Sequence, residues 1–487
     1  MTTSNVKMQS YFERIIICIF LLILTVFATV FYKERIIFTD TVGCIMDMLK
    51  KDSLNVTTNR YISIFGELLP FASYKLNSSL RLIVFLYSLN LILIPVLLAL
   101  LSVYWFKETR TAWSILLFYT IMSARLFYFP ISEFQCGLCF LLFYIGLYEY
   151  SLKKNSRLNA TVFWLLSLFF IPTVVFSHPL SILVLGAWLI FQFFISKKSI
   201  VKPLFIVLIA ALSYLVKKAF FEVPYDSEKA KTMENFKTFS MAHLDDTLAN
   251  QFYKALRDDY FLVPLLIVLS IVALIRMKHY ISAILLPSII LAFWLLVTVS
   301  FKNEPYWYYS EHMYQPLSFF IALATGRLFT ICFSKKFSVL ILTIVVAVSL
   351  NKIYYSHEPM KKRLDWYAGC FELMDKKGIK KTVVGIERID IGWKMEANWL
   401  TMYESLVLSA LDNPEHAKTI TMVWNEQDSR KATMQGESFI TVGIEHWPIK
   451  DVPENYFKLS SSHYSVLADI YSDEEIRRLS YQEIGTN

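Results

Sequence analysis

Long apolar runs separated by short polar breaks make up roughly the first three quarters of the chain. A bilayer core about 30 Å thick is crossed by roughly 20 apolar residues in a helix, so each run is expected to span a membrane. The first run follows Arg14 and has no small-residue cleavage site after it, which favours a retained anchor over a signal peptide. The eleven runs lie at about 15–32, 80–106, 111–129, 133–150, 159–176, 179–196, 203–221, 261–275, 280–301, 313–333 and 337–354.

The polar breaks between these runs are of two alternating kinds. One kind is rich in Lys and Arg, while the breaks at 130–133 and 177–179 contain neither. Short cytoplasmic loops carry an excess of positive charge, so the basic breaks are expected inside the cell, together with the N-terminus. The outer side then receives loops 33–79, 222–260 and 302–312 and the C-terminal tail.

The pattern changes after about residue 355. Three short apolar segments, 382–386, 419–424 and 438–443, are predicted as buried strands, and a helical pattern lies between the first two. Strands that alternate with helices are typical of an α/β domain. The predicted fold class is therefore mainly α: a polytopic membrane domain of about eleven helices over 1–354, followed by a small extracytoplasmic α/β domain over 355–487.

The composition agrees with a membrane protein. Hydrophobic residues make up 55% of the chain and charged residues only 18%, against about 25% in soluble proteins. The net charge of +8 comes from Lys and Arg clusters at the breaks, which the membrane orientation explains without a nucleic-acid partner.

The first outer loop, 33–79, contains two amphipathic stretches. Val42, Ile45, Met46 and Leu49 recur at helical spacing, which predicts a helix lying in the membrane interface. Residues 59–76 predict a second interfacial helix that ends near Pro70. The two helices either roof a cavity between the spans or form a surface-lying pair without a site.

Asp40 stands where the first span ends and the first loop helix begins. A carboxylate placed there is a candidate general base on the outer side of the membrane. An acidic residue is also favoured at a helix N-terminus, so capping by Thr39 or Asp40 is the alternative.

Three more polar residues lie at the outer ends of predicted spans. Glu133 begins a span near hydrocarbon, where an ionisable group is a functional hypothesis, although helix-start placement explains it as well. Arg125 is predicted to snorkel outward, to pair with a carboxylate or to bind a phosphate. His178, in a tight turn, is either structural or part of a site.

Loop 302–316 combines Lys302, Glu311 and His312 with four consecutive aromatic residues. Aromatic residues form a belt at the membrane interface, so alone they indicate little. Together with charged groups they are what a pocket for a sugar or a lipid phosphate uses.

This arrangement resembles the GT-C superfamily of integral membrane glycosyltransferases, which use polyprenyl-phosphate-linked sugars, and within it a divergent bacterial branch. The resemblance rests on the cytoplasmic N-terminus, Asp40 after the first span, two helices in the first loop, Glu133 in the next outer loop and the C-terminal domain. Family members often carry paired acids in the first loop, whereas Thr41 follows Asp40 here. A divalent cation is therefore left open.

The resemblance implies sugar transfer from a polyprenyl-phosphate-sugar donor to a lipid, glycan or protein acceptor, on the outer face of a bacterial inner membrane. Asp40 would accept the proton of the attacking hydroxyl, and Glu133 would orient the acceptor, the base or a metal. The cationic candidates for the departing phosphate are Arg60, Arg125, Lys302 and His312, and His178 and Glu311 complete the predicted substrate-binding set.

Two other classes of protein fit parts of the pattern. Envelope polysaccharide polymerases and ligases are also polytopic, but usually gather Arg and His in one large late outer loop. A transporter or a non-enzymatic scaffold is disfavoured by the few glycines, 13 in all, and by the lack of matching halves.

Overall fold

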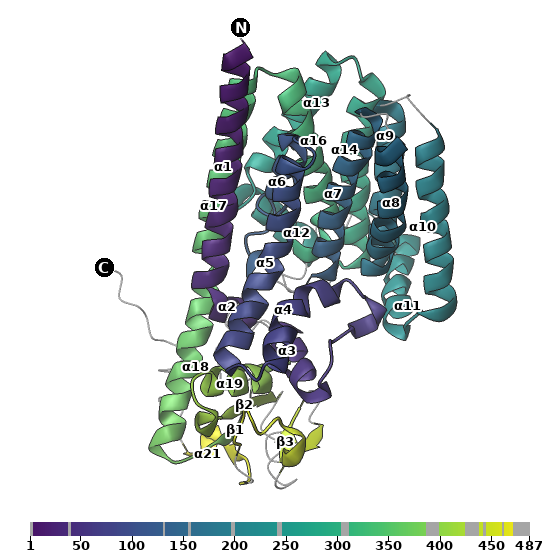
Figure 1. The fold of residues 1–487 in the computed structure, drawn as a ribbon. Helices are drawn as coiled ribbons and strands as arrows, with labels where there is room; N and C mark the ends of the chain where they lie inside the picture. The colour runs from purple at the N-terminus through teal and green to yellow at the C-terminus, as the bar shows by residue number, and fades with distance from the viewer. Residues whose placement is uncertain are drawn as a thin grey trace.

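The computed structural model describes most of the chain as one helical bundle with a small mixed domain at one end (Figure 1). The described residues are 3–37, 40–129, 132–153, 157–195, 200–240, 246–302, 311–385, 399–423, 438–441, 445–459 and 462–470. The four consecutive aromatics of loop 302–316 and the ends of the three predicted strands lie outside these residues.

The long helices run between the two ends of the bundle, and the N-terminus lies at the end opposite the mixed domain (Figure 1). The helices of the bundle are α1 (Thr3–Val30), α5 (Leu80–Tyr104), α6 (Thr109–Phe118), α7 (Glu133–Lys153), α8 (Arg157–Ser177), α9 (Pro179–Ile195), α10 (Val201–Phe220), α12 (Thr247–Asp258), α13 (Leu262–Arg276), α14 (Tyr280–Ser300), α16 (Gln315–Cys332) and α17 (Lys335–Tyr355).

Within the described residues, eight helices are long and apolar enough to cross a membrane, or nine if the bent pair α12 and α13 forms one span. The chain is thus a mainly α protein with several membrane-spanning helices. The predicted count of eleven is not confirmed, because three predicted runs correspond to helices shorter than 18 residues. These are α6, α9 and α13.

The third apolar run, predicted over 111–129, is a helix for only ten residues. The chain then forms turns and a short 3₁₀ helix, η2 (Leu126–Tyr128), inside the bundle. Irregular backbone is tolerated there because other side chains satisfy its polar groups. The carboxylate of Glu311 accepts hydrogen bonds from the amides of Arg125 and Leu126. Gln315 donates to the carbonyl of Met122 over 3.0 Å, and Arg35 donates to the carbonyl of Phe127.

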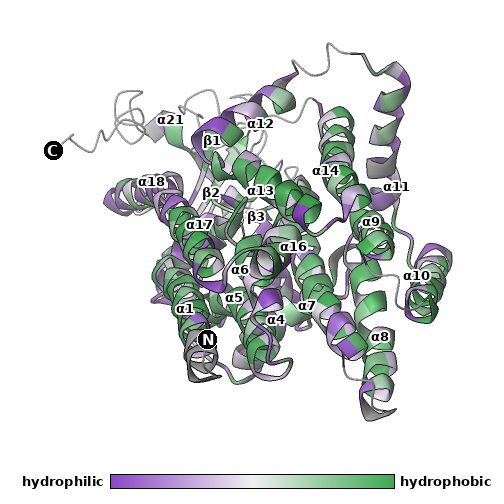
Figure 2. Ribbon diagram, turned by 90° about the horizontal axis from the view of Figure 1, so that it is seen from above, coloured by the Kyte–Doolittle hydropathy of each residue, from purple (hydrophilic) through white to green (hydrophobic). Residues whose placement is uncertain are grey.

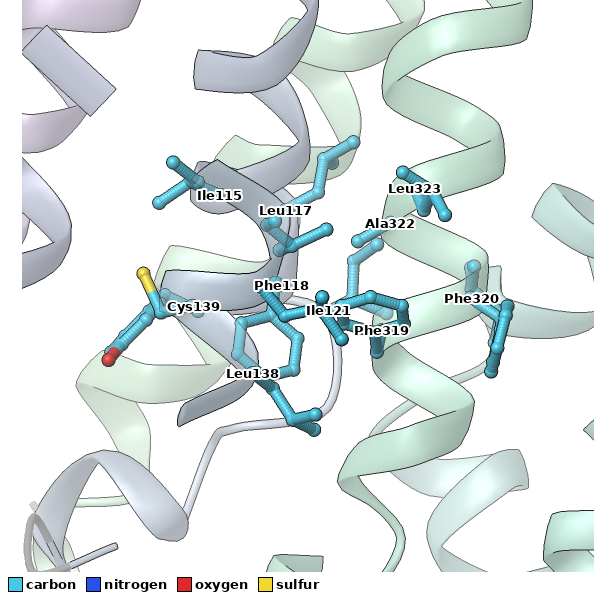
Figure 3. Close-up of a cluster of buried hydrophobic side chains, with 14 of the residues drawn as sticks. Ile115, Leu117, Phe118, Ile121, Leu138, Cys139, Phe319, Phe320, Ala322 and Leu323 are labelled. Carbon is cyan, nitrogen blue, oxygen red and sulfur yellow. The ribbon is translucent and has the colours of Figure 1, made fainter. Parts of the chain in front are cut away.

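The core of the bundle lies where α6, α7 and α16 meet. Apolar side chains from the three helices interdigitate there (Figure 3), among them Phe118, Leu138 and Phe319. Gly326 lets α16 approach α6 closely, since a Cβ at that position would lie 2.8 Å from the backbone nitrogen of Ser114. Small residues at such crossings are typical of membrane helix packing.

The outer surface of the bundle is apolar. Figure 2 shows hydrophobic residues over α8, α9, α10 and α14, while α11 (Pro224–Lys231) is hydrophilic. Large apolar side chains such as Leu165, Leu204 and Ile284 are exposed there. A soluble protein rarely exposes so continuous an apolar surface, so these helices face lipid.

The first loop folds into α2 (Tyr32–Ile36), α3 (Asp40–Lys51) and α4 (Ser63–Lys75). The apolar face of α3 does not lie on lipid. Val42, Ile45 and Met46 are fully buried in a cluster with residues of the C-terminal part of the chain. Helix α4 continues through Pro70 to Lys75, rather than ending near the proline.

The C-terminal part contains a three-stranded sheet of order β2-β1-β5 with parallel neighbours, and a separate antiparallel pair, β3 and β4. Val384 of β1 faces a cluster with α18, while Val383 faces the opposite side of the sheet. The elements are α18 (Glu358–Lys376), β1 (Lys381–Gly385), α19 (Thr401–Ala410), β2 (Thr419–Val423), β3 (Ser438–Ile440), β4 (His446–Pro448), β5 (Ser465–Val466) and α21 (Leu467–Ile470).

The bundle and the C-terminal part are joined by helix. α17 and α18 follow one another without a sharp bend and form one helical segment of 42 residues from Lys335 to Lys376 (Figure 1). The predicted boundary at residue 354 therefore falls just before the end of α17, inside this segment.

Candidate functional site

A cavity of about 960 Å³ opens at the end of the bundle that carries the first loop. Its wall combines α3, the segment 55–60, the start of α7, the turn before α9, the ends of α10 and α14, and α11. Leu400 and Tyr403 of the C-terminal part complete it. Five predicted site residues from five separate segments meet in this wall: Asp40, Arg60, Glu133, His178 and His312.

Helix α3 presents one polar face to this cavity. Asp40, Gly43, Cys44 and Asp47 line it, and their spacing of three, four and seven residues places them on one side of a helix. The apolar residues between them pack against α19 and α5 on the other side. The amphipathic pattern of the sequence thus separates a cavity face from a packing face.

Asp40 is the first residue of α3 and is accessible from the cavity. The Nε1–H of Trp399 donates to its Oδ1 over 3.3 Å. Protein packed around the carboxyl withdraws it from bulk water and raises its pKa, and the Trp399 bond lowers it in part. Asp40 thus both begins a helix and faces the cavity.

Glu133 and Arg60 form an ion pair at the inner wall, with Oε2 and Nη1 3.7 Å apart. Arg60 also pairs with Asp226 of α11 over 2.9 Å. Burial alone would lower the pKa of Arg60, but the two carboxylates outweigh it and raise that pKa, so the guanidinium stays charged. The charges of Glu133 and Asp40 are close enough to interact.

The segment that carries Arg60 is strained. Thr58 and Asn59 both have positive φ, 52° and 54°, which is rare for non-glycine residues and unfavourable for a β-branched one. The hydroxyl of Ser63 donates a hydrogen bond to the carbonyl of Asn55, and the side-chain amide of Asn59 donates to the carbonyl of Phe221. Such strain persists only where surrounding contacts enforce it, and it clusters at functional sites.

Glu67 of α4 lies directly behind this segment. Its carboxyl is buried and accepts from the backbone amide of Asn55 over 2.7 Å, with the hydroxyl of Tyr87 3.4 Å away. Burial raises the pKa of Glu67 to about 7, and these two hydrogen bonds oppose the rise. Glu67 therefore fixes the shape of the cavity wall without itself lining the cavity.

His178, His312 and Phe134 form a triangle of rings, with the two imidazole centres 6.2 Å apart. Burial and the charge of Arg60 lower the pKa of both rings, that of His312 to about 3. The Nδ1 of His178 accepts from the amide of Leu180 over 3.2 Å, which places the proton of the neutral ring on Nε2. The lowered pKa values favour the neutral imidazole at both positions, and the cationic role of His312 stays a prediction of the sequence pattern.

Two lysines at the end of α10 add positive charge to the wall. Lys217 is buried, with Nζ 3.6 Å from Oδ2 of Asp226, and Lys218 is exposed. Other wall residues are apolar or aromatic and exposed, such as Leu183 of α9 at 44% and Tyr214 of α10 at 45%. Two apolar helices thus contribute to the wall beside the charged residues.

Three predicted site residues lie outside this wall. Glu311 binds the backbone amides of η2, and burial raises its pKa to about 7. Glu311 supports the irregular backbone after α6, and its predicted role in binding substrate stays a prediction. Arg125 is half-buried beside Glu311, and Lys302 stands just beyond the wall residue Phe301.

The described residues do not assemble a metal centre. No group of three His, Cys, Asp or Glu side chains among them is placed to hold an ion. Asp40, Glu133 and Asp226 are separately engaged with Trp399 and Arg60.

Sequence reasoning missed several residues of the wall. Lys217 and Lys218 follow an apolar run, a position that also suits ordinary interfacial anchors. Asp226 sits in a loop with several other acidic residues. The contribution of the C-terminal part, through Trp399, Leu400 and Tyr403, left no local signal in the sequence.

Searches against protein-family models, curated proteins and solved structures find no match to this chain.

Proposed function

We propose that this protein is a membrane glycosyltransferase that moves a sugar from a polyprenyl-phosphate carrier to a hydroxyl acceptor at the cavity. The observation that carries the proposal is the meeting of Asp40, Glu133 and Arg60 in one cavity whose wall also includes apolar residues of α9 and α10. A carboxylate base, an orienting acid and cations for a phosphate are what such a transfer needs.

In the proposed reaction the acceptor oxygen attacks the anomeric carbon of the donor sugar. Its proton passes to the carboxylate of Asp40, and the bond between the anomeric carbon and the phosphate oxygen breaks. A carboxylate whose pKa is raised accepts a proton more readily, which suits Asp40 to this role. The carrier leaves as a lipid phosphate, whose added charge Arg60 and the lysines of α10 stabilise. A single displacement of this kind inverts the anomeric centre.

The apolar part of the cavity wall supports a lipid-linked donor. Leu180, Ile182 and Leu183 line the cavity on α9, and Tyr214 lines it on α10. An isoprenoid chain that stays in the bilayer can lie along these residues while its phosphate enters the cavity. The proposed setting is a bacterial inner membrane, with the N-terminus in the cytoplasm and the cavity and C-terminal domain outside.

The test is Asp40→Asn in membranes, assayed as release of polyprenyl phosphate from a panel of polyprenyl-phosphate sugars. We expect the rate to fall about 10²–10⁴-fold, because the amide no longer accepts the proton. Asp52→Asn is the matched control. Asp52 belongs to the same loop but is exposed and pairs with Lys75, so this variant should retain full activity.

Equal protein levels and melting temperatures in the two variants would assign the loss to chemistry. A normal rate in Asp40→Asn would remove Asp40 from the mechanism. No release by the unaltered protein from any donor in the panel would count against the transferase proposal itself.

A further inference from the structure

The carboxylate of Asp226 stands between two cations of the cavity wall. Its Oδ1 is 2.9 Å from Nη2 of Arg60, and its Oδ2 is 3.6 Å from Nζ of Lys217. The two cations come from the first loop and from α10, whereas Asp226 comes from α11. One anionic group thus joins three segments that are far apart in the sequence.

The cavity wall contains buried donors that the protein itself leaves without an acceptor. Within the part of the chain that the structure describes, Nε of Arg60, Nζ of Lys217 and Oγ of Ser300 are buried and have no hydrogen-bond partner. All three residues line the cavity, and the first two flank Asp226. Buried donors without acceptors are costly, which indicates a site that receives further acceptor oxygens.

A phosphate matches this donor set better than a carboxylate does. It brings more terminal oxygens and a larger negative charge, and Arg and Lys bind it through charge-assisted hydrogen bonds. The exposed Lys218 stands in the same wall and adds a further cation.

Helix α11 is lightly attached to the bundle. Pro224, Tyr225, Ser227 and Glu228 are exposed, so moving Asp226 would disrupt little apolar packing. The carboxylate of Asp226 can therefore move away from Arg60 and Lys217 with little loss of packing.

We propose that Asp226 occupies the place of the substrate phosphate and that a phosphate group displaces it, binding between Arg60 and Lys217. This inference rests on the proposed function, since it names where the phosphate of the donor binds. It further assigns α11 as the element that withdraws when that phosphate enters.

The test measures phosphate binding rather than sugar transfer, with the purified full chain in detergent. Farnesyl phosphate, inorganic phosphate and farnesol are titrated into the unaltered protein and into Asp226→Asn. We expect Asp226→Asn to bind farnesyl phosphate about tenfold more tightly, because the competing internal anion is gone. Lys217→Met should weaken the same binding at least about tenfold, and Lys217→Arg should restore it in part.

Lys237→Met is the matched control. Lys237 lies in the same outer loop, is exposed and pairs only with Glu234 among the ion pairs of the described residues, so farnesyl phosphate binding should not change. Farnesol should bind equally to all variants. Tighter binding of both phosphates to Asp226→Asn assigns the effect to the phosphate group, and tighter binding of farnesyl phosphate alone assigns it to a lipid phosphate.

Weaker or unchanged binding of both phosphates in Asp226→Asn would overturn the inference, because Asp226 would then hold the cations in place for the ligand. If Asp226→Asn folds poorly, its melting temperature gives the same test. Phosphate should raise it more than it raises that of the unaltered protein, and an equal rise would overturn the inference. Loss of transfer in Asp40→Asn together with unchanged phosphate binding in Asp226→Asn would leave the proposed function standing and this inference refuted.

Discussion

Two of the clusters in which an arginine of the described residues meets carboxylate groups differ in how completely their polar atoms are satisfied. In the C-terminal part, Arg363 of α18 binds Glu404 of α19 through bonds of 2.7–2.9 Å, and the hydroxyl of Tyr367 donates to the same carboxylate over 2.7 Å. The side chains of Arg363 and Glu404 are 1% and 0% exposed. In the cavity, Arg60 shares two carboxylates, has an unpaired Nε and is 11% exposed.

The cluster of Arg363 and Glu404, here called the closed cluster, has no room for a ligand, so it stabilises the contact between α18 and α19. The cluster around Arg60, here called the open cluster, has donors without acceptors beside a cavity, and its carboxylates come from different segments. The same residue types thus serve structure in one place and a site in the other. The two clusters thus differ in how far their polar atoms are satisfied and in how deeply they are buried.

The closed cluster should give the largest loss of stability. Arg363→Met leaves the buried carboxylate of Glu404 without its cation, and we expect a loss of about 3–5 kcal/mol. The measurement is thermal unfolding of the purified protein. Lys361→Ala is the control on the same helix, since Lys361 pairs with Asp365 at the surface and should cost less than about 0.5 kcal/mol.

The open cluster should show the opposite balance of effects. Arg60→Met should cost only about 1–3 kcal/mol of stability, because water in the cavity reaches the carboxylates that remain. Sugar transfer should nevertheless fall about 100-fold, since a donor to the departing phosphate is lost. The measurements are the rate of sugar transfer and the melting temperature of Arg60→Met, both made on one preparation. A stability loss equal to that of Arg363→Met, with transfer unchanged, would make the two clusters alike.

The smallest effect concerns Glu67, which supports the open cluster from behind. Its pKa rises from an ordinary 4.5 to about 7 in the folded protein. The folded state therefore keeps a proton that the unfolded state loses, so this contribution to stability is full below pH 4.5 and is lost as the pH rises to about 7.

Glu67→Gln cannot ionise, and its melting temperature should fall less than that of the unaltered protein between pH 4.5 and pH 7. The difference should be on the order of 1 kcal/mol per pH unit across this window. Parallel curves for the two proteins would show that Glu67 does not titrate there. Asp52→Asn, which alters an exposed carboxylate, serves as the comparison curve.

Much of the fold follows from local patterns in the sequence. The apolar runs predict the long helices because a helix satisfies its own backbone hydrogen bonds, whatever surrounds it. The spacing of Val42, Ile45 and Met46 predicts a helix, and the apolar stretches around Val383 and Thr421 predict strands. The structure has a helix at the first and strands at the other two.

The remaining features depend on partners distant in the chain. The helix predicted over 111–129 ends early. The side chains of Glu311 and Gln315, nearly 200 residues away, bond the backbone groups that the shortened helix leaves unpaired. The apolar face of α3 meets α19 instead of lipid, a contact across more than 350 residues. In the site, Asp40 and Glu133 follow from their positions beside spans, but no spacing links Asp226 to Arg60.

α17 and α18, which follow one another across a short turn at Ser356 and His357, form a long rod. At 1.5 Å per residue, its 42 residues extend over about 63 Å, so a tilt of about 5° at one end displaces the other by roughly 5 Å. One end of the rod packs beside α1, and the other carries the part of the chain whose Trp399 touches Asp40. A change in the tilt of this helix is therefore expected to move the residues that contact the carboxylate proposed above as the base.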